Sequence, residues 1–391
     1  MTVAPESLEV AVGATAWLTA TTLDARGQVL AGRALTWTSS DTLRVRVGAD
    51  GAVTALDTGT AVVTAASEGR SATARVRAVA LAVPPPPPPP LPPLPPDTAS
   101  PPPPPPPPPP TSGPYADVLG VTYCTGPKST GGTVALKLDV LYPKAATTGP
   151  LPVALWVHGG AWQGDNVNSP LYPQIRDELL ARGFAVVPIH YRLSNTTNGL
   201  GPAPWPAPLE DAKCAVRWLR AHAGTLHLDA ERIGAWGQSA GGHIVAALGT
   251  VPEGTDEGAG GWADRSSRVR AVAVLAPITD LTRGSEVAGI QASALRNEFP
   301  AWPDTTAASI RDASPVRWVS SDDAPFLLVH GDADAMVGVE QSERLDALLR
   351  AAGVPSTLVV VAGGDHSFTT GTPAPAETVA AVVAFFEARV R

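Results

Sequence analysis

Gly237-Gln238-Ser239-Ala240-Gly241 follows a short apolar run, residues 232–236, and precedes a helix-forming run, residues 243–248. This is a G-x-S-x-G motif in the setting that gives it meaning, a sharp turn between a strand and a helix that presents a serine hydroxyl. The glycines are needed because such a turn strains the backbone of the serine, so larger neighbours would clash with it. The positive N-terminal end of the following helix would face negative charge that develops beside the serine. The segment therefore predicts that Ser239 is a nucleophile.

Two apolar runs downstream end in residues that can activate a serine. The first apolar run is followed by His330-Gly331-Asp332-Ala333-Asp334, and the second is followed by a glycine-rich loop that contains His366. A serine hydroxyl is a weak nucleophile until a base takes its proton, and a carboxylate must hold that base in the right tautomer. The residues predict a catalytic triad of Ser239, His366 and one of the two aspartates, Asp332 or Asp334.

An upstream turn supplies candidate donors for an oxyanion. An apolar run, residues 153–157, ends in His158-Gly159-Gly160-Ala161-Trp162. A glycine-rich turn after a strand can aim backbone N–H groups into a site, where they stabilise a tetrahedral oxyanion. We expect the oxyanion hole to consist of the N–H groups of Gly160, Ala161 and Ala240.

Two tryptophans are candidates for the substrate pocket. Trp162 belongs to the oxyanion turn itself, and Trp205 lies in a proline-rich loop, residues 202–208. We expect Trp162 to lie at the site because of its neighbours, and Trp205 to wall the acyl or alcohol pocket. The alternative for loop tryptophans such as Trp205 is that each fills a local apolar gap, whereas the place of Trp162 beside the oxyanion turn puts it at the site whichever way it points.

The ordered set of motifs resembles the α/β-hydrolase superfamily, and more narrowly its hormone-sensitive-lipase-like and bacterial feruloyl-esterase-like branch. The resemblance runs from about Tyr115 to the C-terminus and also draws on residues 138–143, 187–193 and 211–219. Lipase-type relatives carry a third glycine where this chain has Ala161. The tryptophan that follows favours the feruloyl-esterase-like or formamidase-like subgroups.

The resemblance implies roles for the site residues and an activity. By resemblance Asp334 is the triad acid, and Asp332 is a hydrogen-bond acceptor that structures the loop. The implied activity is a serine carboxylic-ester hydrolase that forms an acyl-enzyme, needs no cofactor, and acts on short acyl or aromatic esters, such as feruloyl or acetyl groups on plant polysaccharide. The alternatives are an arylformamidase-type amidase, a peptidase, and a surface-adhesion protein with an inert hydrolase domain. An intact motif set argues against inertness, because a decayed site usually loses an essential residue.

Apolar segments beyond residue 115 alternate between strand and helix, which is typical of a doubly wound, mostly parallel sheet in an α/β fold. We expect an antiparallel edge from strands near 118–124 and 133–141, followed by parallel strands near 153–157, 184–190, 232–236, 270–276, 325–330 and 357–362. Helices are expected at 207–222, 338–352 and 375–390. Insertions at 193–208, 252–268 and 283–305 fall on loops and are candidate pocket walls.

Residues 2–80 have a different pattern, with short Val/Thr/Ala-rich strands separated by turns at the spacing of a β-sandwich. We expect Trp17 or Trp37 to join alternating valines in the core. Residues 35–41, 50–55 and 59–65 resemble bacterial group-2 immunoglobulin-like domains. The segment contains no catalytic cluster, so the resemblance implies a spacer or adhesion module.

A proline-rich run, residues 84–110, separates these two parts of the chain. Such a run adopts extended polyproline II at ~3.1 Å per residue rather than helix or sheet. We therefore expect an all-β immunoglobulin-like sandwich at 1–83, a proline-rich linker at 84–113 and an α/β-hydrolase catalytic domain at 114–391.

Composition and charge exclude several classes of function. The 391 residues carry a net charge of −8 with no basic stripe, which argues against nucleic-acid binding. No apolar run is long enough to span a membrane, and no histidine or cysteine has the spacing of a metal site. No leader is visible at Met1. We nevertheless expect export, with the leader upstream, because a sandwich, a stiff spacer and an esterase form an extracellular layout in which the sandwich contacts a cell surface or polysaccharide.

Cys124 and Cys214 are the two cysteines of the chain. In an exported protein two cysteines pair more often than they stay free, so we predict a disulfide between them. The alternative is two ordinary buried thiols.

Overall fold

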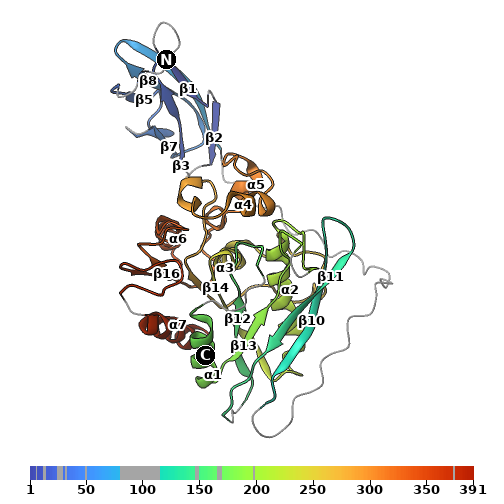
Figure 1. The fold of residues 1–391 in the computed structure, drawn as a ribbon. Coiled ribbons are helices and arrows are strands. Elements are labelled where there is room, and N and C mark those ends of the chain that lie inside the picture. The colour runs from blue at the N-terminus through green and yellow to red at the C-terminus, as the bar shows by residue number, and fades with distance from the viewer. Residues whose placement is uncertain are drawn as a thin grey trace. The chain divides into compact units, whose positions relative to one another are not determined.

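The structure is a computed structural model that describes residues 1–391 except 6, 12–14, 24–29, 31–32, 49–50, 80–114, 146–148, 165–169, 197–198 and 373–374. The chain forms two compact units, Met1–Ala99 and Ser100–Arg391 (Figure 1). The predicted proline-rich linker at 84–113 lies outside the described residues.

The N-terminal unit is a small β-sandwich. Its strands are β1 (Thr2–Ala4), β2 (Ser7–Ala11), β3 (Thr15–Trp17), β4 (Thr19–Thr21), β5 (Thr36–Ser39), β6 (Val45–Val47), β7 (Ala52–Ala55), β8 (Gly59–Ser67) and β9 (Arg70–Val79). They form a four-stranded sheet, β2-β9-β8-β5, a three-stranded sheet, β3-β7-β6, and the pair β1-β4. Alternate residues of β8 and β9 are buried, as a sandwich requires. Trp37 packs against this core, whereas Trp17 is 62% exposed.

An eight-stranded sheet organises the C-terminal unit. Its strands are β10 (Val118–Pro127), β11 (Thr133–Val140), β12 (Leu151–Val157), β13 (Ala185–Ile189), β14 (Leu228–Gln238), β15 (Ala271–Leu275), β16 (Phe326–Gly331) and β17 (Ser356–Val361), and their order is β10-β11-β13-β12-β14-β15-β16-β17. Strands β10 and β11 are antiparallel to their neighbours, and the others run parallel. The predicted α/β fold with a mostly parallel sheet is therefore confirmed.

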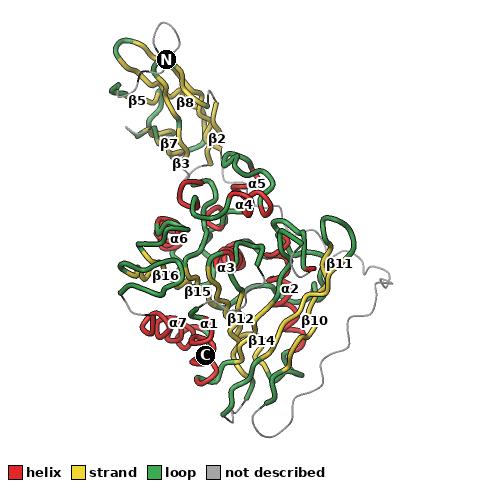
Figure 2. Tube along the Cα trace, viewed as in Figure 1, coloured by secondary structure: helices red, strands yellow, loops and turns green. Residues whose placement is uncertain are grey.

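Helices cover both faces of this sheet (Figure 2). They are α1 (Tyr172–Ala181), α2 (Ala207–His222), α3 (Ala240–Thr250), α4 (Ala292–Glu298), α5 (Ala308–Asp312), α6 (Glu340–Ala351) and α7 (Pro375–Arg389), with short 3-10 turns η2 (Gly284–Val287) and η3 (Pro315–Arg317). Trp156 and Trp236 of the sheet pack with α1 and α7 on one face. Val153 and Leu155, which alternate with Trp156 along β12, pack with α2, α3 and α6 on the other face. Strands buried on both faces explain the continuous apolar runs in the sequence.

Two features fix the antiparallel edge and the insertion at 252–268. Cys124 on β10 and Cys214 on α2 form a disulfide, with their Cα atoms 6.5 Å apart. Gly260 lies directly over this disulfide, where a Cβ would collide with the sulfur of Cys214. Glu257 of the same insertion forms ion pairs with Lys213 and Arg217 of α2. The insertion is therefore anchored to α2.

Candidate active site

Ser239 occupies the turn between β14 and α3. Its backbone is in the left-handed region, with φ 57° and ψ −122°. A Cβ at Gly241 would collide with the carbonyl oxygen of Val157, and one at Gly237 would collide with the carbonyl oxygen of Gly241. Only glycine fits at both positions: Gly237 because the turn itself is tight, and Gly241 because the turn packs closely against the end of β12.

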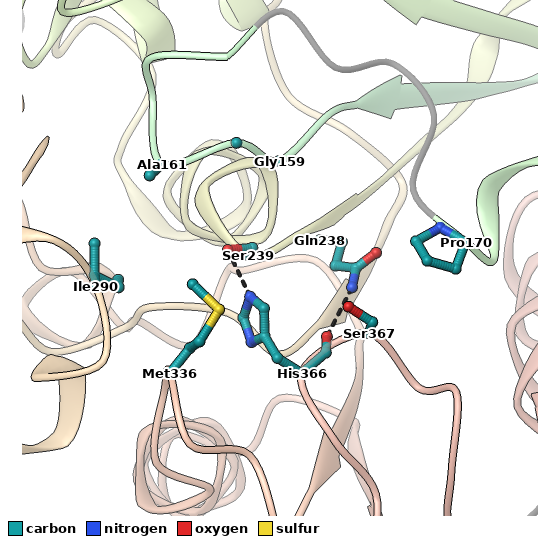
Figure 3. Close-up of a pocket in the computed structure, with 10 residues that line it drawn as sticks. Gly159, Ala161, Pro170, Gln238, Ser239, Ile290, Met336, His366 and Ser367 are labelled. Carbon is teal, nitrogen blue, oxygen red and sulfur yellow. Dashed lines mark hydrogen bonds between the residues drawn. The ribbon is translucent and has the colours of Figure 1, made fainter.

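Ser239, His366 and Asp334 form a continuous chain of hydrogen bonds. Nε2 of His366 lies 2.9 Å from Oγ of Ser239, and Nδ1 lies 2.6 Å from Oδ2 of Asp334 (Figure 3 shows the first bond). With the carboxylate ionised, Nδ1 carries the ring proton and donates a hydrogen bond to Asp334. Nε2 is then the acceptor for the serine hydroxyl. The site joins the ends of β14, β16 and β17, three strands distant in sequence.

The carboxylate of Asp334 is held ionised by its surroundings. Burial acts to raise its pKa, but hydrogen bonds from His330 and His366 and from the N–H of Val337 outweigh burial and place the pKa well below its ordinary value. The N–H groups of Met336 and Val337 donate to Oδ1 at 2.8 and 3.0 Å. The carboxylate is therefore fixed in position as well as in charge.

Asp332 has a different partner. Its Oδ1 accepts a hydrogen bond from the N–H of Gly363 at 2.6 Å, which links the loop after β16 to the loop after β17. His330, on the same loop, is buried between Oγ of Ser342 at 2.7 Å and the carbonyl oxygen of Val337 at 3.0 Å. The side chains of Asp332 and His330 therefore hold the loop that contains Asp334 in place through hydrogen bonds.

The turn after β12 provides backbone donors beside Ser239. Gly160 and Ala161 both have positive φ, at 112° and 51°. Within the described part of the chain, no backbone carbonyl accepts from the N–H groups of Gly160, Ala161 or Ala240. The ring of His158 holds this turn, because Nδ1 lies 2.7 Å from the carbonyl oxygen of Gly159 and the ring stacks on Tyr191 at 4.3 Å. Three donors of the predicted oxyanion hole thus have no backbone acceptor there.

A pocket of about 240 Å³ opens over these groups. It is lined by Gly159, Gly160, Ala161, Pro170, Gln238, Ser239, Ile290, Met336, His366 and Ser367 (Figure 3). The sequence reasoning did not single out Pro170, Gln238, Ile290, Met336 or Ser367. Two signals were available, because Ile290 lies in the insertion at 283–305 and Met336 follows Asp334 by two residues.

Trp162 and Trp205 are not among the residues that line this pocket. The ring of Trp162 is fully buried and packs edge-on against His243 at 5.4 Å and Phe299 at 5.1 Å. Trp205 packs against His243 at 4.5 Å. The expectation that Trp162 contributes to the substrate pocket is therefore not met, because its ring is buried against Phe299 and His243, and Trp205 packs beside it as in the alternative that the sequence left open.

Gln238 makes a contact that the sequence did not reveal. Its Nε2 donates to the carbonyl oxygen of His366 at 2.9 Å (Figure 3). The residue before the nucleophile therefore ties the serine turn to the histidine loop.

The described residues hold no group of three His, Cys, Asp or Glu side chains arranged for a metal ion. Within the same residues, no helix has both the length and the apolarity needed to cross a membrane.

The sequence profile of the BD-FAE family matches residues 138–349, which include Ser239 and Asp334. The profile of the bacterial Ig-like domain (group 2) matches residues 1–76. The predicted resemblance to esterases of the α/β-hydrolase superfamily and to group-2 immunoglobulin-like domains is therefore confirmed.

Individual proteins are similar to the catalytic part of the chain. The probable carboxylic ester hydrolase LipM of Mycobacterium tuberculosis (strain ATCC 25618 / H37Rv) is 29% identical over 247 residues, which cover 62% of this chain and 56% of LipM. A truncated carbohydrate esterase from gut microbiota superposes with a TM-score of 0.58 and 26% identity over 72% of this chain and 98% of that one. An acetyl ester-xyloside bifunctional hydrolase from Caldicellulosiruptor lactoaceticus gives a TM-score of 0.54 and 25% identity over 65% and 88%. The chain spans about half the length of the curated relatives it matches.

Proposed function

We propose that this chain, which belongs to the BD-FAE family, is a serine carboxylic-ester hydrolase that works through an acyl-enzyme. The observation that carries the proposal is the unbroken chain of hydrogen bonds from Asp334 through His366 to Ser239. Similar proteins are named as carboxylic ester hydrolases or esterases, which supports ester hydrolysis as the reaction.

In the proposed reaction, the oxygen of Ser239 attacks the ester carbonyl carbon while its proton passes to Nε2 of His366. The tetrahedral intermediate carries a negative oxygen, which the N–H groups of Gly160, Ala161 and Ala240 stabilise. The bond to the alcohol oxygen then breaks, and His366 gives the proton to that oxygen. Water attacks the remaining acyl-enzyme by the same route and releases the carboxylic acid.

Asp334 has two tasks in this mechanism. Its hydrogen bond keeps the proton on Nδ1 of His366, so Nε2 is free to accept from Ser239. Its negative charge stabilises the imidazolium that forms when the serine proton arrives. The carboxylate stays ionised at neutral pH despite its burial, because the hydrogen bonds from His330, His366 and the N–H of Val337 lower its pKa by more than burial raises it.

The proposed substrates are short acyl or aromatic esters, such as acetyl or feruloyl groups carried by a sugar or polysaccharide. The pocket of about 240 Å³ supports a small acyl group, because pockets for drug-sized ligands hold roughly 300–1,000 Å³. Structural similarity to a carbohydrate esterase and to an acetyl ester-xyloside hydrolase supports a sugar as the alcohol.

The decisive experiment is Ser239→Ala, measured on p-nitrophenyl acetate and methyl ferulate. Loss of the nucleophile is expected to reduce kcat by on the order of 10⁶, the effect known for the best-studied triad enzyme. Ser309→Ala, an exposed serine on α5, is the matched control and is expected to keep full activity. Unchanged hydrolysis by Ser239→Ala would move the nucleophile elsewhere and overturn the proposal.

We further propose that the protein works outside the cell, where the immunoglobulin-like unit holds the catalytic unit against a cell surface or a polysaccharide. The match of residues 1–76 to a group-2 Ig-like domain supports this placement. Fractionation of expressing cells checks it: the intact protein is expected in the medium or on the cell surface, and a purely intracellular pool would contradict it.

A further inference from the structure

The pocket over Ser239 has two chemically different sides. Figure 3 shows Ile290 and Met336 on one side of the Ser239–His366 pair. The opposite side is lined by smaller or polar side chains, which are Pro170, Gln238 and Ser367. Ile290 and Met336 are the only large apolar side chains that line the pocket within the described chain.

We propose that Ile290 and Met336 form the acyl wall of the pocket, restrict the acyl group to short chains (acetyl rather than feruloyl among the proposed substrates), and leave the polar side to a hydroxylated alcohol. The inference rests on the proposed function, because an acyl wall exists only if Ser239 accepts an acyl group. Beyond its carbonyl, an alkyl acyl chain has nothing to hydrogen-bond and gains most on the apolar side. A sugar placed there would lose hydrogen bonds of its hydroxyl groups, so it belongs on the other side.

Backbone packing holds the two wall residues together. Gly289, which precedes Ile290, lies so close to the backbone of Ala335 and Met336 that a Cβ would collide with both. The insertion that carries Ile290 is therefore in direct contact with the loop that carries Asp334 and Met336. A side chain at position 289 would push the two loops apart, so the width of the wall depends on this glycine.

Glu286 clamps the same two segments a few residues away. Its carboxylate accepts from Arg344 at 2.7 and 3.0 Å and from Nε2 of Gln341 at 2.8 Å, both on α6. Its carbonyl oxygen accepts from the N–H of Gly338 at 2.7 Å. Glu286 lies within η2 and Gly289 follows the end of η2, so two neighbouring contacts hold the insertion to the segment that carries Met336 and α6. A wall held in this way sets a sharp length limit.

Truncation of the wall is the test. We would measure kcat/KM on p-nitrophenyl acetate, butyrate, hexanoate and octanoate for the wild type, Ile290→Ala, Met336→Ala and the double variant. Each methylene that finds new apolar space is worth roughly a factor of four. The ratio of octanoate to acetate is expected to rise at least tenfold in the double variant, with smaller rises in the single variants.

Leu348→Ala is the matched control, because Leu348 on α6 and Met336 are each 39% exposed and Leu348 does not line the pocket. Its chain-length ratio is expected to equal that of the wild type. An unchanged ratio in the double variant, with hydrolysis still abolished by Ser239→Ala, overturns the acyl wall alone. Hydrolysis that survives Ser239→Ala overturns the proposed function, whatever the ratio does.

Gly289→Ala tests the backbone contact independently. It is expected to alter the octanoate-to-acetate ratio at least threefold, because the added methyl group displaces Ile290 and Met336 together. Gly224→Ala is its control, since a Cβ at Gly224 meets no atom within 4 Å. A ratio unchanged by Gly289→Ala would mean that the contact does not position the wall. If that variant does not fold, the variants of Ile290 and Met336 still decide the proposal.

Discussion

At the residue scale, the carboxylates of Asp332 and Asp334 stand two residues apart and meet different partners. Asp334 contacts Nδ1 of His366, whereas Asp332 accepts only from the backbone of Gly363 among the described residues. The side chain of Asp334 is fully buried against His366, so its replacement by a residue without a carboxylate leaves Nδ1 of His366 without this acceptor.

Asp334→Asn is therefore expected to reduce kcat by about 10⁴-fold, the loss seen when a triad acid no longer sets the histidine tautomer. Asp332→Asn is expected to act mainly through stability, because its bond joins two loops. Steady-state kinetics and thermal unfolding of both variants separate the two effects. A larger kinetic loss in Asp332→Asn would reverse the assignment of the acid.

Glu298 is a second residue whose environment has a measurable consequence. Its carboxyl is fully buried at the end of α4, and neither oxygen has a hydrogen-bond partner among the described residues. Burial raises its pKa well above the ordinary value; the nearby Ser194 hydroxyl, which donates to the carbonyl oxygen of Trp162, offsets this only in part, and the charge of Asp211 adds to the rise. The folded protein therefore favours the neutral form of this carboxyl up to a higher pH than the unfolded chain does.

Glu298→Gln is expected to stabilise the protein increasingly as pH rises. The unfolded chain releases this proton near pH ~4.3, whereas the folded chain keeps it to a higher pH, so between the unfolded and the folded pKa the wild type loses stability by up to about 1.4 kcal/mol per pH unit. Glutamine has the shape of the neutral acid and does not titrate. Urea unfolding of both proteins at pH 4, 6 and 8 checks this, and a difference in unfolding free energy that does not change with pH would contradict it.

At the scale of elements, the antiparallel edge depends on a covalent tie. The Cys124–Cys214 disulfide joins β10 to α2 across 90 residues of sequence. In the chain-entropy account, closing a loop of this length restricts the unfolded state and stabilises the fold by about 4 to 5 kcal/mol.

The double variant Cys124→Ala/Cys214→Ala is expected to lose that amount in unfolding free energy. Thiol titration of the denatured, unreduced wild type is expected to find no free thiol, and two after reduction. Two free thiols before reduction would show that the bond does not form in the protein as purified.

At the scale of the whole molecule, the two units have separate cores. The sandwich buries its own valines, and every residue of the proposed site lies in the unit Ser100–Arg391. None of the residues that line the pocket or form the hydrogen-bonded chain Asp334–His366–Ser239 belongs to the described part of the N-terminal unit. The proposed contribution of that unit is placement on a surface or polymer.

A chain that begins at Tyr115 is therefore expected to keep kcat/KM on p-nitrophenyl acetate within about threefold, which is well under 1 kcal/mol of transition-state stabilisation. Activity on an insoluble acetylated polysaccharide is expected to fall further. Loss of small-ester hydrolysis in a truncated chain that still folds would mean that the N-terminal unit helps to form the site.

The order of elements and the candidate nucleophile were readable from the sequence. The predicted helix at 207–222 coincides with α2, and the apolar runs lie within a few residues of the observed strands, although β14 begins four residues earlier than expected. Such features arise from interactions between near neighbours, so a single stretch contains all the information they need. The glycines around Ser239 also act within one turn.

Contacts between loops that are distant in sequence were visible only in the tertiary structure. The bond from Gln238 to the carbonyl of His366 spans 128 residues, and the contact of Gly289 with Met336 joins an insertion to the loop after β16. The loops that make these contacts have no periodic pattern of apolar residues, so their sequences do not indicate which other loop each one packs against. The side chain of Trp162 points into the core, because its ring packs there against the rings of His243 and Phe299. The local sequence pattern thus determined which residues lie at the ends of the strands, whereas packing between the strand ends determined which of them line the pocket.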